Sequence, residues 1–247
     1  MSSTNSSIFK LSKKIFFFKK IYIYYNIYIR NFKFFFKPSQ FGEDKKIIKL
    51  FKKKGTYLDI GCFHPVRQSN TFLMHKLEWR GINIDLNPLT IDLFNIARPK
   101  DKNICAAVSN KKENRNMYFH HELSSVNTLD KNHTLFLKKH FGIVDLKKKK
   151  IRTKTITEIL LKLKIKNIDF LNIDIEGGEL NVLKSINFKY FDIKVICVEI
   201  INYKSFHKKL KTDKSKIFKL LKKNKYSLKF RSSINYIFIK KNIRLAK

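Results

Sequence analysis

The sequence predicts an α/β fold in which a mostly parallel sheet ends in an antiparallel pair of strands. Along most of the chain, short apolar segments alternate with stretches of helical periodicity, as expected for parallel strands joined by crossover helices. Two further strand-like segments follow the last helical stretch and are joined by the turn-like sequence Ser232–Asn235. So short a connection joins antiparallel strands, and we expect this pair at one edge of the sheet.

Candidate N-cap residues mark the helices in the first half of the chain. Ser39 can cap a helix after the domain boundary at Pro38–Asp44, and Ser69 or Asn70 can cap the next one. Asn87, which precedes a proline, is a favourable N-cap for a third helix. The strands expected here are Tyr57–Ile60, Ile82–Ile84 and Asn103–Val108, and the second and third helices are Thr71–Leu77 and Pro88–Ala97.

The second half of the chain combines clear elements with a poorly patterned insertion. Met117–His120 can form an added strand, whereas Glu122–Lys150 is expected to be rich in loops and ends in a run of lysines. Thr155 and Glu158 have the spacing of a capping box, which predicts a short helix. The remaining strands are expected at Ile168–Ile173, Val195–Ile200, Tyr226–Phe230 and Tyr236–Lys240, and the remaining helices at Glu179–Ser185 and Ile217–Lys223.

The net charge of +35 is extreme for a chain of 247 residues. It indicates either a partner that carries phosphates, such as nucleic acid or an anionic membrane, or a bias in composition. The chain is rich in Lys, Ile, Asn, Phe and Tyr and poor in Ala, as an AT-rich genome produces. Lysine also far outnumbers arginine, the better residue for forked recognition of phosphate. We therefore favour the bias as the explanation.

Residues 1–37 form a basic, aromatic N-terminal arm, and residues 38–247 are expected to form the folded α/β domain. The apolar runs Ile15–Phe18, Ile21–Ile29 and Phe34–Phe36 are interrupted by lysine and arginine. No uncharged run approaches the roughly 18–20 residues that a spanning helix needs, and no signal-peptide cleavage site follows. We expect a cytoplasmic protein. The arm either contacts the inner face of an anionic membrane or is a packing or poorly ordered extension.

The three cysteines predict neither a disulfide framework nor a zinc site. Cys62, Cys105 and Cys197 are far apart and form no paired motif, so reduced, buried thiols are expected. The histidines likewise lack a metal-binding spacing. No metal site is predicted.

Acidic residues at the ends of the first two strands predict a cofactor that contains ribose. Asp59 and Gly61 end the first strand, and Asp85 ends the second about two dozen residues later, where an acid can accept hydrogen bonds from ribose hydroxyls. The glycines of a dinucleotide loop do not follow Gly61, and the chain has no phosphate-binding P-loop. A cofactor with ribose but no phosphate fits better, which indicates S-adenosylmethionine.

A set of motifs extends along the chain: Ser39–Asp44, Leu58–Pro65, Ser69–Thr71, Trp79–Asp85 with Asn87–Pro88, and Ile168–Glu179. Together they resemble the FkbM family of S-adenosylmethionine-dependent methyltransferases over roughly Pro38 to Ile200. The most specific part is Asp174–Glu179, followed by Val182–Leu183 and later by Val198–Glu199. The resemblance implies a Rossmann-like class I methyltransferase sheet and O-methylation of a hydroxyl on a sugar, glycan or other small molecule.

The resemblance also implies roles for individual residues. Asp85 would hold the ribose, and Asp174 and Glu176 would face the transferred methyl group and the acceptor. The cofactor's methionine end would lie against Asp59, Gly61 and Cys62 of the first loop, and its adenine against Asn87, Ala107 and Val108.

The chemistry requires an aligned acceptor and a base, because the sulfonium methyl is already activated. Glu176, Asp174 and His64 are the candidate bases, although His64 is better explained as a hydrogen-bonded loop residue. We expect the two acids to bind acceptor hydroxyls rather than a cation.

The main alternative is a nucleic-acid (RNA) methyltransferase that uses the basic surface, and a third is a membrane-surface module without activity. The loop after the fourth strand lacks the Asn/Asp-Pro-Pro-aromatic sequence typical of base methylation, and its carboxylates would repel a phosphate backbone. The acids at three strand ends argue against a module without activity.

Overall fold

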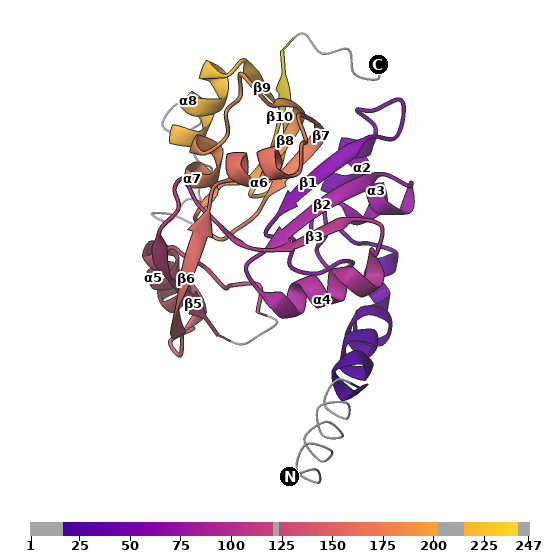
Figure 1. Ribbon diagram of the computed structural model, residues 1–247, viewed down its shortest axis with the longest axis vertical. Coiled ribbons are helices and arrows are strands. Elements are labelled where there is room, and N and C mark those ends of the chain that lie inside the picture. Colours follow the sequence, from indigo (N-terminus) through magenta and orange to yellow (C-terminus); the bar gives the residue numbers. More distant parts are fainter. Residues whose placement is uncertain (1–16, 121–123, 202–214, 242–247) are drawn as a thin grey trace, which may run out of the picture.

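The computed structural model describes residues 17–120, 124–201 and 215–241. A seven-stranded sheet in the order β3-β2-β1-β7-β8-β10-β9 forms its centre (Figure 1). β10 runs antiparallel to both of its neighbours, β8 and β9, as expected for the last two strands, and the other pairs of this sheet are parallel. The strands are β1 (Thr56–Ile60), β2 (Arg80–Asp85), β3 (Lys102–Cys105), β7 (Asn167–Ile173), β8 (Asp192–Glu199), β9 (Tyr226–Ser232) and β10 (Asn235–Lys240).

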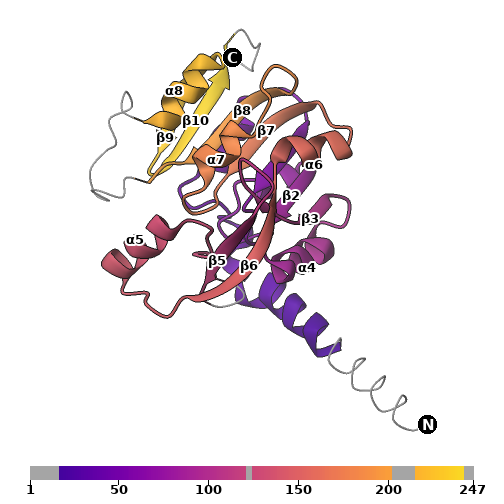
Figure 2. The same ribbon diagram turned by 60° about the vertical axis from the view of Figure 1, so that its left-hand side comes forward.

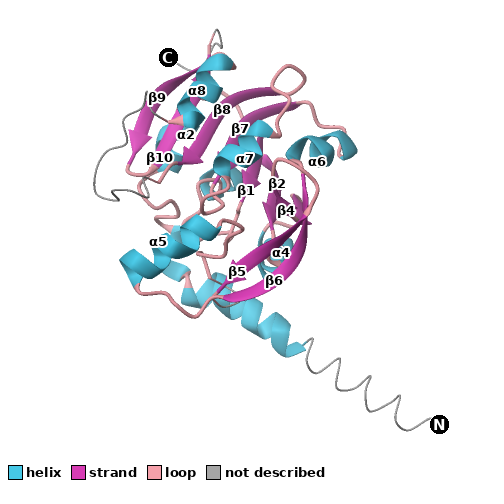
Figure 3. Ribbon diagram, turned by 90° about the vertical axis from the view of Figure 1, so that its left-hand side faces the viewer, coloured by secondary structure: helices cyan, strands magenta, loops and turns pink. Residues whose placement is uncertain are grey.

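Helices cover both faces of this sheet. Apolar residues of α6, α7 and α8 pack on one face, in front of the strands in Figure 3, and α2 and α3 pack on the other. The central strands are apolar on both faces for this reason: Phe170 and Leu171 of β7 point to opposite faces, and neither has exposed surface. The helices are α2 (Glu43–Ile48), α3 (Phe72–Lys76), α4 (Pro88–Ala97), α6 (Ile156–Lys162), α7 (Glu179–Lys184) and α8 (Lys216–Lys223).

Two of the predicted N-caps are confirmed and two are wrong. Asn87 accepts a hydrogen bond from Leu89 N–H at the start of α4, and Thr155 accepts one from Glu158 N–H at the start of α6. The helix after Ser39 is instead capped by Gly42, because the Ser39 hydroxyl donates to Asp44. The cap of α3 is Thr71, without a side-chain bond, since Ser69 and Asn70 join a buried polar network.

The expected third strand is two strands that belong to different sheets. Residues 102–105 form β3 of the large sheet, whereas β4 (Ala107–Val108) pairs with β6 in a three-stranded sheet of order β4-β6-β5. The insertion is also more ordered than predicted, because it contains α5 (Lys131–Phe141), and the lysine run begins β6 (Lys147–Lys154). Pairing with β5 (Asn114–Phe119) makes the lysine run a strand despite its low strand propensity.

The described part of the N-terminal arm, residues 17–36, is helical and projects from the domain (Figure 2). Residues 17–24 are α-helical, followed by η1 (Tyr25–Arg30) and η2 (Phe32–Phe35). Ile23 and Ile27 on one side pack against Val66, Phe72 and Leu93 of the domain. No helix among the described residues is long and apolar enough to cross a membrane.

Candidate active site

A cavity of about 310 Å³, the strand-end pocket, lies at the carboxyl ends of β1, β2 and β7. This is where the strand order of an open α/β sheet reverses, since the chain proceeds from β1 to β2 and β3 on one side and to β7 and β8 on the other. Helix α5 of the insertion contributes His133, Phe136 and Leu137 to the pocket.

Gly61 brings the first loop against the acidic loop that follows β7. Its N–H donates to Ile84 O at 2.8 Å, and its φ of 78° lies in the left-handed region. A Cβ atom at this position would lie 1.7 Å from the backbone oxygen of Asp174. Only glycine fits so close an approach, so Gly61 holds together the two loops that line the pocket.

The Asp85 carboxylate is fixed at the end of β2 by backbone donors. Its Oδ2 accepts from Phe63 N–H at 3.1 Å, and its Oδ1 accepts from Asn87 N–H at 2.8 Å. Burial raises its pKa from 3.8 to about 6, against the lowering effect of these hydrogen bonds. A fixed carboxylate at this position can accept further hydrogen bonds from a pair of hydroxyls.

A buried polar network supports the pocket beneath Asp59. The two carboxylate oxygens of Asp59 accept from Thr71 Oγ1 at 2.7 Å and from Asn172 Nδ2 at 2.9 Å. Arg98, which has no exposed surface, donates to Thr71 Oγ1 at 2.9 Å. Asn70 donates to Asn172 at 3.1 Å, but its own Oδ1, buried in the pocket lining, has no hydrogen-bond partner in the described part of the chain.

Six of the seven predicted cofactor residues line the pocket. Ala107 does not, because it is buried in β4, where it pairs with Thr153 of β6. The six that line it are Asp59, Gly61, Cys62, Asp85, Asn87 and Val108. Cys62 and Cys197 are buried free thiols, whereas Cys105 is exposed. Asn70 also lines the pocket and was not among the predicted site residues, although it is part of the Ser69–Thr71 motif.

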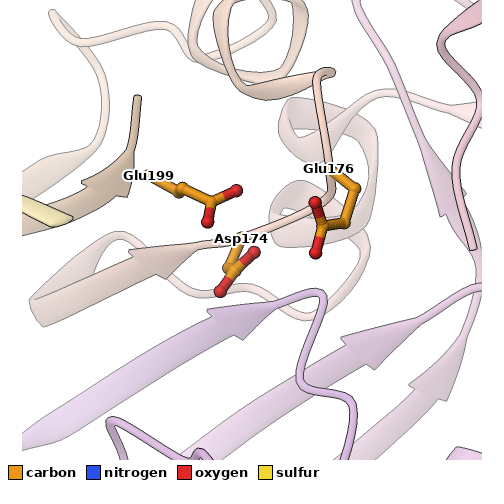
Figure 4. A group of neighbouring side chains, drawn as sticks. All are labelled: Asp174, Glu176 and Glu199. Carbon is orange, nitrogen blue, oxygen red and sulfur yellow. The ribbon is translucent and has the colours of Figure 1, made fainter. Parts of the chain in front are cut away.

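Asp174, Glu176 and Glu199 form an acid cluster on the β7–β8 side of the pocket (Figure 4). One carboxylate oxygen from each residue lies within 4.8 Å of the other two. Burial, followed by repulsion from Glu179, raises the pKa of Asp174 to about 7. Burial, followed by repulsion from Asp174, raises the pKa values of Glu176 and Glu199 well above their usual range. Glu199, the last residue of β8, was not among the predicted site residues.

The Glu176 backbone is held in a conformation that is unusual for a residue with a side chain. Its φ is 58°, and Thr128 Oγ1 donates to its carbonyl oxygen at 2.6 Å. Glu179 Oε1 accepts from Ile175 N–H at 3.2 Å and from Gly177 N–H at 2.9 Å. Glu179 thus fixes the loop instead of facing the pocket. His133 Nε2 lies 3.1 Å from Glu176 Oε2, and burial lowers the His133 pKa to about 4.

His64, the third candidate base, lies outside the described lining of the pocket. Its Nδ1 accepts from Val66 N–H at 3.1 Å and from Arg67 N–H at 3.0 Å, and its Nε2 lies 3.2 Å from Asn31 Nδ2 of the arm. Burial lowers its pKa to about 3. These contacts fit the hydrogen-bonded loop residue that the sequence also allowed, so we do not propose His64 as the base.

The sheet order, the antiparallel β10 and the acids at the ends of β1 and β2 define a Rossmann-like class I methyltransferase. The model of the methyltransferase FkbM domain matches residues 59–228, which is more than half of the chain. The protein therefore belongs to the FkbM methyltransferase family and is an S-adenosylmethionine-dependent enzyme.

One solved structure is also similar to the chain. It is a TehB-like SAM-dependent methyltransferase from Corynebacterium glutamicum, 12% identical, with 81% of this chain and 88% of that chain covered and a TM-score of 0.42. A comparison with curated proteins finds no match.

Proposed function

We propose that the enzyme methylates a hydroxyl of a sugar, glycan or other small molecule. The observation that carries this proposal is the acidic lining of the strand-end pocket. Among the described residues, five carboxylates line it, from Asp59, Asp85, Asp174, Glu176 and Glu199, and no lysine or arginine does. Carboxylates accept hydrogen bonds from hydroxyls and repel the phosphates of a nucleic acid.

The pocket residues fit S-adenosylmethionine. Asp85 would accept hydrogen bonds from the ribose hydroxyls, and Val108 offers an apolar surface to the adenine beside Asn87. The buried Asn70 Oδ1, which lacks a partner among the described residues, would accept from the ammonium group of the methionine end. Asp59, Gly61 and Cys62 would lie along that end. When bound, the cofactor supplies a methyl group that is already activated on a sulfonium sulfur.

The acid cluster would act on the acceptor. Asp174 and Glu176 would accept a hydrogen bond from the acceptor hydroxyl and so orient its oxygen toward the methyl group. As the new O–CH₃ bond forms and the C–S bond breaks, the hydroxyl proton passes to a carboxylate oxygen of the cluster. The hydrogen bond from Thr128 fixes the Glu176 backbone from which one of these carboxylates projects.

A methyl-transfer panel tests the proposed acceptor class. Purified enzyme is incubated with methyl-labelled S-adenosylmethionine and, separately, with polysaccharides, small hydroxyl compounds and total RNA. We expect label on a sugar or small-molecule hydroxyl, and a loss of at least roughly a hundredfold in rate for Glu176→Gln. Label in RNA alone would overturn the proposal in favour of an RNA methyltransferase.

We also propose that the N-terminal arm, residues 1–37, is an extension that packs on the catalytic domain, 38–247, through Ile23 and Ile27 and rests on an anionic membrane with its exposed side. Residues 17–36 expose large apolar side chains, among them Ile29 (68%) and Phe36 (73%). The arm carries lysines and Arg30 but no acidic residue from 17 to 37. Exposed aromatic residues beside cations are typical of segments that insert into the boundary of an anionic bilayer.

Vesicle sedimentation tests the membrane contact. The enzyme is expected to sediment with vesicles that contain phosphatidylglycerol and to stay in solution with phosphatidylcholine alone, and the binding is expected to weaken with salt. Equal partition with both vesicle types would contradict the electrostatic part of the proposal.

A further inference from the structure

We propose that Asp174, Glu176 and Glu199 form a binding site for a hard divalent cation of the Mg²⁺, Mn²⁺ and Ca²⁺ class. The three side chains come from the ends of the neighbouring strands β7 and β8 and from the loop after β7. Their carboxylates turn toward one another at the edge of the sheet (Figure 4). Carboxylate oxygens are the ligands that such ions prefer.

The spacing of the cluster suits a single ion. One oxygen from each of the three carboxylates lies within 4.8 Å of the other two. Ligands on opposite sides of Ca²⁺ lie about 4.6–5.2 Å apart, because each Ca–O distance is about 2.3–2.6 Å. For the shorter bonds of Mg²⁺, adjacent ligands lie about 3 Å apart, so small side-chain rotations would complete the site.

Glu199 provides the observation that points to a ligand. Only 6% of this residue is exposed, and its Oε2 is buried without a hydrogen-bond partner in the described part of the chain. Asn235 is its register partner on β10, but the Asn235 amide donates to Glu43 Oε1 at 2.7 Å. A buried carboxylate oxygen with no donor is costly unless it binds a proton or a cation.

The described residues place no lysine or arginine beside the cluster, although the chain contains 54 of them. None of them lines the strand-end pocket within the described residues. The basic side chain that does lie beside the cluster is His133, whose Nε2 is 3.1 Å from Glu176 Oε2. Glu179 of the same loop accepts two backbone hydrogen bonds and adds a further acidic group that repels Asp174. A cation from solution would supply the missing positive charge.

Three protein ligands leave positions of the ion open to other oxygens. One or two hydroxyls of an acceptor can occupy them, which would fix the reacting oxygen and favour transfer of its proton to a carboxylate oxygen of the cluster that does not bind the ion. This use of the ion rests on the proposed function, whereas the cation site itself does not.

Titration of Mn²⁺ into chelator-treated, full-length enzyme tests the site, with free Mn²⁺ measured by electron paramagnetic resonance. We expect one Mn²⁺ per chain, displaced by excess Mg²⁺ or Ca²⁺. Glu199→Gln is expected to lower the Mn²⁺ affinity on the order of tenfold or more. The matched control is Glu158→Gln, because Glu158 lies on α6 and does not line the pocket.

Two measurements keep the result interpretable. S-adenosylmethionine binding and thermal unfolding show that the Glu199→Gln variant is folded. The cation site is overturned if Mn²⁺ does not bind stoichiometrically, or if Glu199→Gln and Glu158→Gln bind it with equal affinity. Protons would then be what balances the charge of the cluster. If Mn²⁺ binds but methyl transfer to hydroxyls is unchanged by excess chelator, the role at the acceptor is overturned. If Mn²⁺ binds and no hydroxyl is methylated, the proposed function fails and the site stands.

Discussion

The strand-end pocket and the N-terminal arm are opposite in charge although they belong to the same basic chain. Five carboxylates and no lysine or arginine line the described pocket, whereas the described arm has basic but no acidic residues. A bias in composition can put lysine on any solvated surface at little cost. It does not explain why lysine is kept out of the pocket. The net charge therefore says little about the acceptor, and the charge of the pocket says more.

The largest expected effect is at the contact that forms the pocket. Gly61→Ala should destabilise the fold by about 4 kcal/mol or more, because the added Cβ meets the Asp174 backbone at a left-handed φ. Gly142→Ala is the matched control, since Gly142 has a φ of 66° with open space around its Cβ position, and should cost about 1 kcal/mol. Urea unfolding measures both, and similar losses would show that the close approach is unimportant.

Loss of the predicted ribose ligand should act on cofactor binding. Asp85→Ala is expected to weaken S-adenosylmethionine binding at least roughly tenfold, or about 1.4 kcal/mol. Asp145→Ala is a control, because Asp145 is exposed and does not line the pocket. Calorimetric titration compares the variants, and an unchanged affinity for Asp85→Ala would remove Asp85 from the site.

The raised pKa of Asp85 gives the pocket a pH dependence. The ionised carboxylate is the better acceptor for ribose hydroxyls, so cofactor affinity should fall as the pH drops through about 6. In the cofactor-free protein, the folded state holds the proton more tightly than the unfolded state. Protonated Asp85 therefore contributes to the stability of the fold. This contribution is fully present below pH 3.8 and is lost as the pH rises through about 6. The contribution of Asp85 to both trends should be absent in Asp85→Asn, while the acid cluster keeps its own contribution to stability, and identical pH profiles in both proteins would refute this assignment.

The smallest expected effect on methyl transfer concerns the exposed side of the arm. Serine at Ile29, Phe32 and Phe36 together should reduce binding to anionic vesicles by roughly tenfold or more, with little change in methyl transfer to a soluble acceptor. Leu135→Ser is the control, because Leu135 is an exposed apolar residue on α5. If the triple variant still sediments like the wild type, the arm does not contact the membrane through these side chains.

Local signals predicted most of the fold. The N-cap at Asn87 and the capping box at Thr155 act within a few residues, so the sequence shows them directly. The predictions that were wrong concern elements that form only through tertiary contacts. Residues 103–108 were expected to form one strand, but they are divided between two sheets, and the lysine run becomes a strand only through pairing with β5. Neither partner can be recognised from the local pattern.

The site was predicted unevenly for the same reason. Asp85 and Asp174 follow strands that are recognisable alone, and both line the pocket. Glu199 reaches Asp174 only because β8 pairs with β7 in register. Asn70 was interpreted as a helix cap, whereas its side chain donates to Asn172, a hundred and two residues away. The sequence feature that could have identified Glu199 is its position: it is an acid at the end of a strand, and that strand lies next to β7 and its loop.

The most direct measurement of the central claim is a competition between acceptor classes in one reaction. The enzyme, methyl-labelled S-adenosylmethionine, total RNA and a mixture of glycans and small hydroxyl compounds are incubated together, and the labelled products are separated by mass spectrometry. The acidic pocket predicts label on hydroxyls of sugars or small molecules, with RNA unlabelled. Label that accumulates on RNA while the hydroxyl compounds stay unlabelled would contradict the account.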